Sequence, residues 1–262
     1  MMGRLDDKVA VITGGSKGIG AAIAAALAAE GADCVLAART ESDLAARADA
    51  IRSSSGRRVE TVAGDLRDAA GCELLHARTL ELFGRVDILV NSAGATKAGP
   101  FLEVSDEAWM DGFALKFHAA VRLCRLFWPQ LTHSHGTVVN IIGGLARTPS
   151  PDIAIGGAVN AAFANFGKAL AGLGLRDDVN VNNIHPGQTR TERHKTLMQS
   201  RAEAAGTTPE EFEQRIIERQ GIRRLGEPED VANLAVFLCL PESRHIQGTS
   251  ISVDGGGTAG LF

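Results

Sequence analysis

The sequence feature that most constrains the fold is a regular alternation of short apolar runs with longer helical patterns along all 262 residues. The apolar runs predict about seven strands, at residues 9–12, 34–38, 59–63, 86–90, 137–142, 179–184 and 250–253. Helical patterns occupy residues 18–30, 41–53, 68–83, 105–131, 156–173 and 228–240. Strands that alternate with helices pair in parallel, and continuous apolar strands belong to a sheet that is covered on both faces. We therefore predict a single, doubly wound α/β domain over residues 1–262.

A glycine-rich loop joins the first predicted strand to the first predicted helix, with the sequence Thr13-Gly14-Gly15-Ser16-Lys17-Gly18-Ile19-Gly20. Glycines let the backbone turn tightly and approach a pyrophosphate, while the helix N-terminus offers free N–H groups and partial positive charge. A strand before the loop and a helix after it favour a dinucleotide-binding, Rossmann-type sheet over an ordinary turn. The expected contacts come from Gly14, Ser16, Lys17, Gly18, Ile19 and Gly20.

The end of the second predicted strand bears on the choice of dinucleotide. A carboxylate about twenty residues after the glycine loop would bind the 2′-hydroxyl of an NAD ribose. Here the strand ends in Ala38 and Arg39, and Lys17 adds a second cation nearby. Because a guanidinium can grip a 2′-phosphate and no anion repels it, we predict NADP(H) rather than NAD(H). The alternative is that Arg39 is a solvated charge at a strand end.

Residues 191–224 interrupt the strand–helix rhythm with a charged segment of helical pattern. Ligands of open α/β sheets bind outside the carboxyl ends of the strands, where such an insertion can close over them. We therefore expect a substrate lid over about residues 191–224.

Composition narrows the partners and the compartment. With 27 Lys and Arg against 31 Asp and Glu, the net charge is −4, which argues against nucleic acid or an anionic membrane as a partner. The first residues resemble no signal peptide, and no apolar run is long enough to span a bilayer. The four cysteines are widely spaced and form no C-x-x-C pair. We expect reduced thiols, no metal site and a cytoplasmic location.

Five motifs in order resemble those of the short-chain dehydrogenase/reductase family, and the resemblance covers essentially the whole chain. They are T-G-x-x-x-G-x-G at 13–20, Gly64-Asp65-Leu66, Asn91-Ser92-Ala93-Gly94, Val139-Asn140-Ile141 and Pro186-Gly187. The resemblance implies adenine contacts from Asp65 and Leu66, ribose contacts from Asn91, Ala93 and Gly94, and nicotinamide or phosphate contacts from Thr189 and Thr191. It also implies that Asn160, Pro186 and Gly187 lie in the cofactor site, and that the chain forms a homodimer or homotetramer.

The resemblance fails at the catalytic positions. Members of the family use a Tyr as the proton carrier, a Lys four residues later, a Ser that orients the substrate, and an Asn in the long helix. The aligned positions here hold Gly156, Asn160, Gly143 and Lys116, and the chain contains no Tyr at all. An alkoxide that forms beside a hydride donor needs a proton donor within hydrogen-bond reach, so ordinary carbonyl reduction through this tetrad is implausible. The two glycines also predict a wider cleft.

Two remaining polar residues are predicted to carry the chemistry. Lys116 stands among the apolar residues Phe113, Leu115 and Phe117, where desolvation would lower its pKa and make it an acid, a base or an amine nucleophile. Asp152, in the loop 145–155 that should border the cleft, could pair with it. The alternative for Lys116 is a surface ammonium or a helix-packing contact.

Two classes of function stay open. One is an NADP(H)-dependent, oxidoreductase-family enzyme with a non-standard site, acting on an unknown carbonyl or alcohol compound that a wider cleft allows to be bulky. Its proton would come from Lys116, Asp152 or water, or it would catalyse a non-redox step such as an aldol reaction, a dehydration or a cyclisation. The other is a non-catalytic NADP(H)-binding sensor or partner subunit. The lid-like insertion favours an enzyme.

Overall fold

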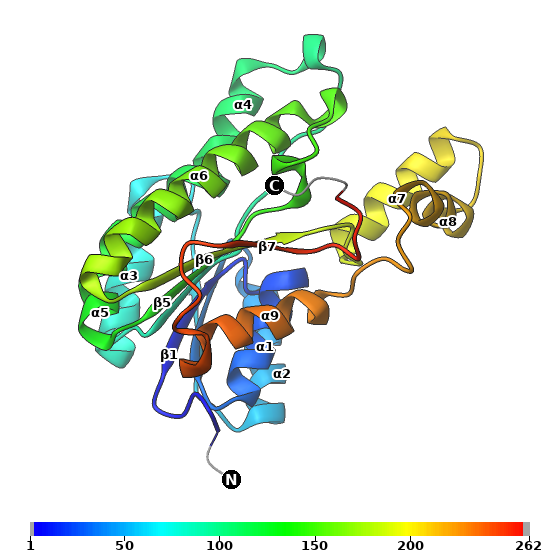
Figure 1. The fold of residues 1–262 in the computed structure, drawn as a ribbon. Helices are drawn as coiled ribbons and strands as arrows, with labels where there is room; N and C mark the ends of the chain where they lie inside the picture. Colours follow the sequence, from blue (N-terminus) through cyan, green and yellow to red (C-terminus); the bar gives the residue numbers. More distant parts are fainter. Residues whose placement is uncertain (1–2, 259–262) are drawn as a thin grey trace.

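The strands form one parallel sheet in the order β3-β2-β1-β4-β5-β6-β7 (Figure 1). They are β1 (Val9–Thr13), β2 (Asp33–Ala38), β3 (Val59–Ala63), β4 (Ile88–Asn91), β5 (Thr137–Ile141), β6 (Asn180–Pro186) and β7 (Ser250–Val253). The computed structural model describes residues 3–258, so residues 1–2 and 259–262 of the predicted domain lie outside the described part. The strand order reverses between β1 and β4, which opens a crevice at the carboxyl ends of these strands. The predicted doubly wound α/β domain is confirmed.

Helices cover both faces of the sheet because successive strand residues point to opposite sides. Ala10 and Ile12 of β1 pack under α1 (Gly18–Ala29), α2 (Glu41–Ser55) and α9 (Pro228–Cys239). Val11 packs on the other face, with α3 (Ala69–Phe83), α5 (Ala119–Ser134) and α6 (Ala154–Asp177). The two apolar layers hold the sheet rigid beneath the crevice.

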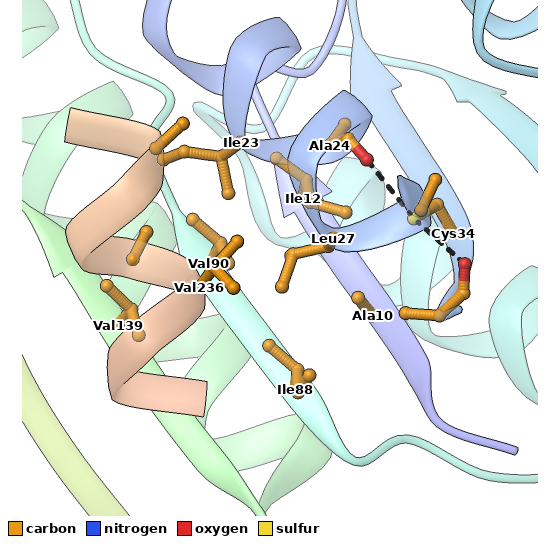
Figure 2. Close-up of a cluster of buried hydrophobic side chains, with 14 of the residues drawn as sticks. Ala10, Ile12, Ile23, Ala24, Leu27, Cys34, Ile88, Val90, Val139 and Val236 are labelled. Atoms are coloured by element: carbon orange, nitrogen blue, oxygen red, sulfur yellow. Dashed lines mark hydrogen bonds between the residues drawn. The ribbon is translucent and has the colours of Figure 1, made fainter. Parts of the chain in front are cut away.

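The layer between α1, α9 and the sheet illustrates how tightly this core is filled. Figure 2 shows Ile23 of α1 and Val236 of α9 directed toward the strand residues Ile12 and Val90. The Cys34 thiol lies 3.8 Å from the carbonyl oxygen of Ala24 in the same layer (Figure 2). Substitutions to smaller residues in this layer would leave cavities beneath the glycine loop.

Capping side chains and glycines mark the ends of several helices. The Asp68 side chain accepts a hydrogen bond of 2.8 Å from the backbone N–H of Gly71 at the start of α3. Helices α2 and α3 each end at a glycine, Gly56 and Gly84, with φ of +69° and +70°. Short 3-10 turns occupy Phe101–Glu103, Gly144–Ala146, Pro151–Ile153 and Pro241–Ser243.

The helix predicted over 105–131 is more complex than expected. Its start is capped by Ser105, and it consists of α4 (Asp106–Phe113), a π turn at Ala114–His118, and α5, which continues to Ser134. A π turn inserts one residue into the helical ladder and rotates the side chains within it, and apolar periodicity does not resolve it. The helix predicted over 156–173 is also longer, because α6 starts at Ala154 and ends at Asp177.

The 191–224 segment folds as two helices, α7 (Glu192–Ala204) and α8 (Pro209–Gln220). They stand apart from the helices that cover the sheet, in yellow to ochre in Figure 1. They share a small apolar cluster of their own, made by Met198, Ile216, Ile222 and Leu225. Within residues 3–258, no helix has the length and apolar character that a membrane span requires.

Candidate active site

A cleft of about 430 Å³ opens at the carboxyl ends of the central strands. Its walls come from the glycine loop, the segment after β4, the π turn, the end of β5, the end of β6 and the first turn of α7. The lining residues are Gly14, Lys17, Gly18, Ile19, Gly20, Ser92, Ala93, Gly94, Lys116, Ile141, Ile142, Gly143, Pro186, Gly187, Thr191, Glu192 and Arg193.

The glycine loop leaves no room for side chains. A Cβ at Gly20 would lie 2.4 Å from the carbonyl oxygen of Gly14, and one at Gly14 would lie 3.1 Å from that of Ser92. Gly14 and Gly18 have φ of +67° and +54°, a conformation that favours glycine. The free N–H groups at the start of α1 therefore reach the cleft without cover, which fits a dinucleotide pyrophosphate.

The cations expected near the 2′-position of the ribose have different surroundings. Arg39 is exposed at the end of β2. Lys17 forms an ion pair of 2.6 Å with Asp43 of α2. Asp65, the expected adenine contact, is exposed and pairs with Arg67 at 3.0 Å, while the Leu66 side chain is buried in the core. Of the two expected cations, Arg39 is therefore more available to a phosphate than Lys17.

A buried ladder of amides changes the interpretation of Asn91. Its Nδ2 donates to Asn140 Oδ1 at 3.0 Å, and Asn140 Nδ2 donates to Asn183 Oδ1 at 3.1 Å. These residues tie β4, β5 and β6 together, because a buried amide is costly unless it is paired. The Asn91 side-chain amide is therefore engaged within the sheet, and the ribose contact that the resemblance implies for Asn91 stays a prediction.

Residues after β6 form the wall opposite the glycine loop. Thr191 caps α7 by accepting a hydrogen bond from the His194 N–H at 3.2 Å. Its methyl group would lie 3.1 Å from a Cβ at Gly18. Thr189 is buried, and its hydroxyl donates to the Gly187 carbonyl at 3.1 Å. Thr191 therefore lines the cleft, whereas Thr189 supports the backbone behind it.

Lys116 enters the cleft from the π turn. Its Nζ donates to the carbonyl oxygen of Ile142, and its side chain lies along Gly94, where a Cβ would come within 3.0 Å of Lys116 Cδ. Burial, and to a smaller extent the positive charge of Arg193, lower the pKa of Lys116 to about 8. The ionisation of this amine therefore lies closer to neutral pH than that of an exposed lysine.

The glycines at two of the other aligned positions, Gly143 and Gly156, are closely approached by neighbouring side chains. A Cβ at Gly156 would lie 3.1 Å from Ile153 Cγ1 and 3.2 Å from both Leu145 Cδ1 and Thr96 Oγ1. A Cβ at Gly143 would lie 2.9 Å from Asn160 Nδ2. Even the first atom of a side chain at either position would therefore be in tight contact with its neighbours, and the wider cleft expected from the sequence stays a prediction.

Two buried polar atoms near Gly143 have no hydrogen-bond partner among the described residues. They are Asn160 Oδ1 and His185 Nε2. His185 Nδ1 lies 3.1 Å from the Gly143 carbonyl, and burial lowers the pKa of its imidazole. A neutral imidazole and an amide oxygen are thus left with hydrogen-bonding capacity in the buried region beside Gly143.

Asp152 lies in a different place from the one expected. It is exposed and lines a second pocket beneath α7 and α8, while Lys116 lines the first. The expected acid/base pair is therefore wrong as a direct contact, because loop geometry is not encoded in local sequence.

Sequence reasoning missed Arg193, which donates to the carbonyl oxygens of Gly94 and Thr96 at 3.3 and 3.0 Å. These bonds join the start of α7 to the segment after β4. The pattern of Thr191 followed by a charged helical turn signals a capped helix start, but nothing local shows where that helix docks.

Comparison with known proteins gives matches along almost the whole chain. A family model described as Enoyl-(Acyl carrier protein) reductase matches residues 14–258. An uncharacterized oxidoreductase of Mycobacterium tuberculosis is 39% identical over 260 residues, covering 97% of this chain and 94% of that protein. Dehydrogenase/reductase SDR family member 4 of Caenorhabditis elegans is 31% identical over 261 residues, with 98% of each chain covered. The crystal structure of L-sorbose reductase from Gluconobacter frateurii, complexed with NADPH and L-sorbose, has a TM-score of 0.95 at 34% identity and covers 99% of both chains.

Proposed function

The chain belongs to the short-chain dehydrogenase/reductase family, and we propose that it is an NADP(H)-dependent oxidoreductase for a carbonyl or alcohol compound, with Lys116 in place of the missing tyrosine. The observation that carries this proposal is the shared cleft: the glycine loop and the Lys116 amine line the same cavity. A dinucleotide-binding loop alone would also fit a sensor. A half-buried amine in the same cleft can in addition transfer a proton to or from a substrate, which favours an enzyme.

The preference for NADP(H) rests on Arg39. It is exposed beyond β2, where a 2′-phosphate would lie if the pyrophosphate sits on the glycine loop. Charge-assisted, bidentate hydrogen bonds to phosphate suit a guanidinium. The L-sorbose reductase relative is complexed with NADPH, which supports the same preference.

When bound, the nicotinamide supplies or accepts hydride at the substrate carbon. The residues of the chain must hold the substrate oxygen and move its proton. In reduction, the Lys116 ammonium donates a proton to the oxygen as negative charge develops there. Since its pKa is lowered to about 8, the amine regains a proton from solvent near neutral pH. The Ile142 carbonyl, which accepts from Nζ, orients the amine along Gly94.

The helices α7 and α8 serve as the substrate lid in this proposal. Arg193 fastens the start of α7 to the cleft, and Arg190 pairs with Glu213 and Glu227 at the base of the lid. A lid that closes over the cleft would exclude water from the reacting atoms.

We also propose a homo-oligomer in the cytoplasm. Phe101 and Met110, near and on α4, are 60% and 71% exposed, which supports a partner surface there.

Burial raises the pKa of both Cys34 and Cys124 to about 12, which supports unreactive, reduced thiols.

The first test is calorimetric titration with NADPH and NADH. NADPH should bind with a dissociation constant of micromolar order or tighter, well ahead of NADH. Arg39→Gln should weaken NADPH about tenfold and leave NADH unchanged. Arg78→Gln, an exposed arginine of α3, is the matched control for lost charge. If neither dinucleotide binds, the cofactor proposal is wrong.

The second test is turnover, followed by the absorbance of the reduced nicotinamide across a panel of ketones, aldehydes and ketose sugars that includes L-sorbose. For any substrate that is turned over, Lys116→Met should lower kcat by about a hundredfold or more and keep NADPH affinity. Equal kcat in the two proteins would exclude Lys116 as the proton carrier. NADPH that binds and is never consumed would point instead to the sensor alternative.

A further inference from the structure

A second pocket, of about 730 Å³, lies between the lid helices and two loops at residues 98–100 and 150–153. The Gly99 N–H donates to the Asp152 carbonyl at 2.9 Å, so the two loops form one wall. On α7, Arg193 lines the cleft, while Leu197 and Arg201 line this pocket. Residues spaced by four share a helix face, so one face of α7 runs from the cleft into the second pocket.

Three guanidinium groups line this pocket: Arg201 of α7, and Arg215 and Arg219 of α8. Within residues 3–258, none of the three forms a side-chain hydrogen bond or an ion pair. Other arginines of the lid region do find carboxylates, as Arg224 does with Asp230 at 2.7 Å. The pocket's own carboxylate is Asp152.

The charge pattern of α8 explains part of this placement, because Arg219 lies in the last turn, where a cation is favourable, and Arg215 lies one turn after Glu211. It does not explain why the three guanidinium groups face one pocket. Arg215 and Arg219 are four residues apart on α8, and like charges at this spacing destabilise a helix. An anion in the pocket would relieve this repulsion through charge-assisted hydrogen bonds.

The rest of the pocket is apolar. Leu197 is 37% exposed there, and Ile153, Phe212 and Ile216 complete its lining. Apolar surface beside unpaired guanidiniums matches a ligand with a hydrocarbon body and an anionic group.

We infer that this pocket binds the anionic end of an amphipathic substrate, a carboxylate or a phosphate on an apolar body, through Arg201, Arg215 and Arg219. This inference rests on the proposed function, since it makes the pocket the distal part of the substrate site whose reacting end lies in the cleft. It gives the lid a second role, as the element that selects substrates by charge.

The test uses the full chain and three probes that share one alkyl chain: octanoate, octyl phosphate and octanol. Calorimetric titrations are run with and without NADPH. At least one of the two anions should bind about tenfold or more tightly than octanol, and rising salt should weaken it. The tighter anion identifies the group, carboxylate or phosphate. Equal binding of octanol, or no binding of either anion, would overturn the inference.

Variants locate the binding. Arg215→Gln/Arg219→Gln should weaken the anion about tenfold or more, while Arg215→Lys/Arg219→Lys should keep part of the affinity. Arg78→Gln should change nothing. Unchanged affinity in the Gln double variant would refute the assignment. NADPH titration of the same proteins separates the two proposals. The affinity for NADPH should be unchanged in the lid variants. If the unmodified chain does not bind NADPH, the proposed function is wrong, while the result for the anions stands.

Discussion

Gly143→Ser restores at one position the residue that the family uses, and we predict that it destabilises the protein. Gly143 has φ of +137° and ψ of 151°. This region of backbone conformation is essentially reserved for glycine, and a residue with a Cβ loses about 1–3 kcal/mol there. The new Cβ would also lie 2.9 Å from Asn160 Nδ2, an overpacked contact that costs about 1–3 kcal/mol.

Together these terms predict a loss of about 2–6 kcal/mol in the free energy of unfolding. For a domain of this size, that loss lowers Tm by roughly 4–24 °C. The two terms can be separated. In Gly143→Ser/Asn160→Ala the amide is absent, so the contact term should vanish while the backbone term stays.

The assay is thermal and urea unfolding followed by circular dichroism. Gly172→Ala is the matched control, because Gly172 lies inside α6 and a Cβ there meets nothing within 4 Å. It should gain about 0.5–1 kcal/mol from helix propensity and the restricted unfolded chain. Wild-type stability in Gly143→Ser would refute the reasoning, since the site would then tolerate the serine without rearrangement.

Three further predictions concern other parts of the site. Burial lowers the Lys116 pKa from 10.5 to about 8, so between these values the unfolded chain binds more protons and stability rises with pH. Lys116→Met should therefore be more stable than the unmodified protein below pH 8 and lose this advantage toward pH 10.5. A difference between their urea midpoints that stays constant from pH 8 to pH 10.5 would contradict this. Gly20→Ala would put a Cβ 2.4 Å from the Gly14 carbonyl oxygen, and NADPH affinity should fall about tenfold or more by calorimetry, whereas Gly172→Ala should keep it. Asn140→Ala leaves the amides of Asn91 and Asn183 without their partner and should cost about 2–5 kcal/mol in urea unfolding; an unchanged midpoint would mean that the amide ladder does not stabilise the sheet.

Close contacts surround Gly143 and Gly156, the positions that the resemblance aligns with the family's Ser and Tyr. Asn160 and Ile153 lie close to Gly143 and Gly156, so a side chain added at either glycine would press on its neighbour. The Lys116 amine already lines the cleft, so its chemistry is the first that we would test.

The local sequence determined the sheet and the glycine loop, because their causes are short in range. Apolar periodicity sets strand and helix, and Gly14, Gly18 and Gly20 set a loop that only glycine can form. It also excluded a tyrosine mechanism, since the chain contains no Tyr. Only the tertiary structure decided which side chains meet. The π turn directed Lys116 into the cleft, the amide ladder engaged Asn91 within the sheet, and the docking of α7 and α8 gathered three arginines beside Asp152. These contacts join elements far apart in the chain, and their geometry depends on packing that no local pattern records.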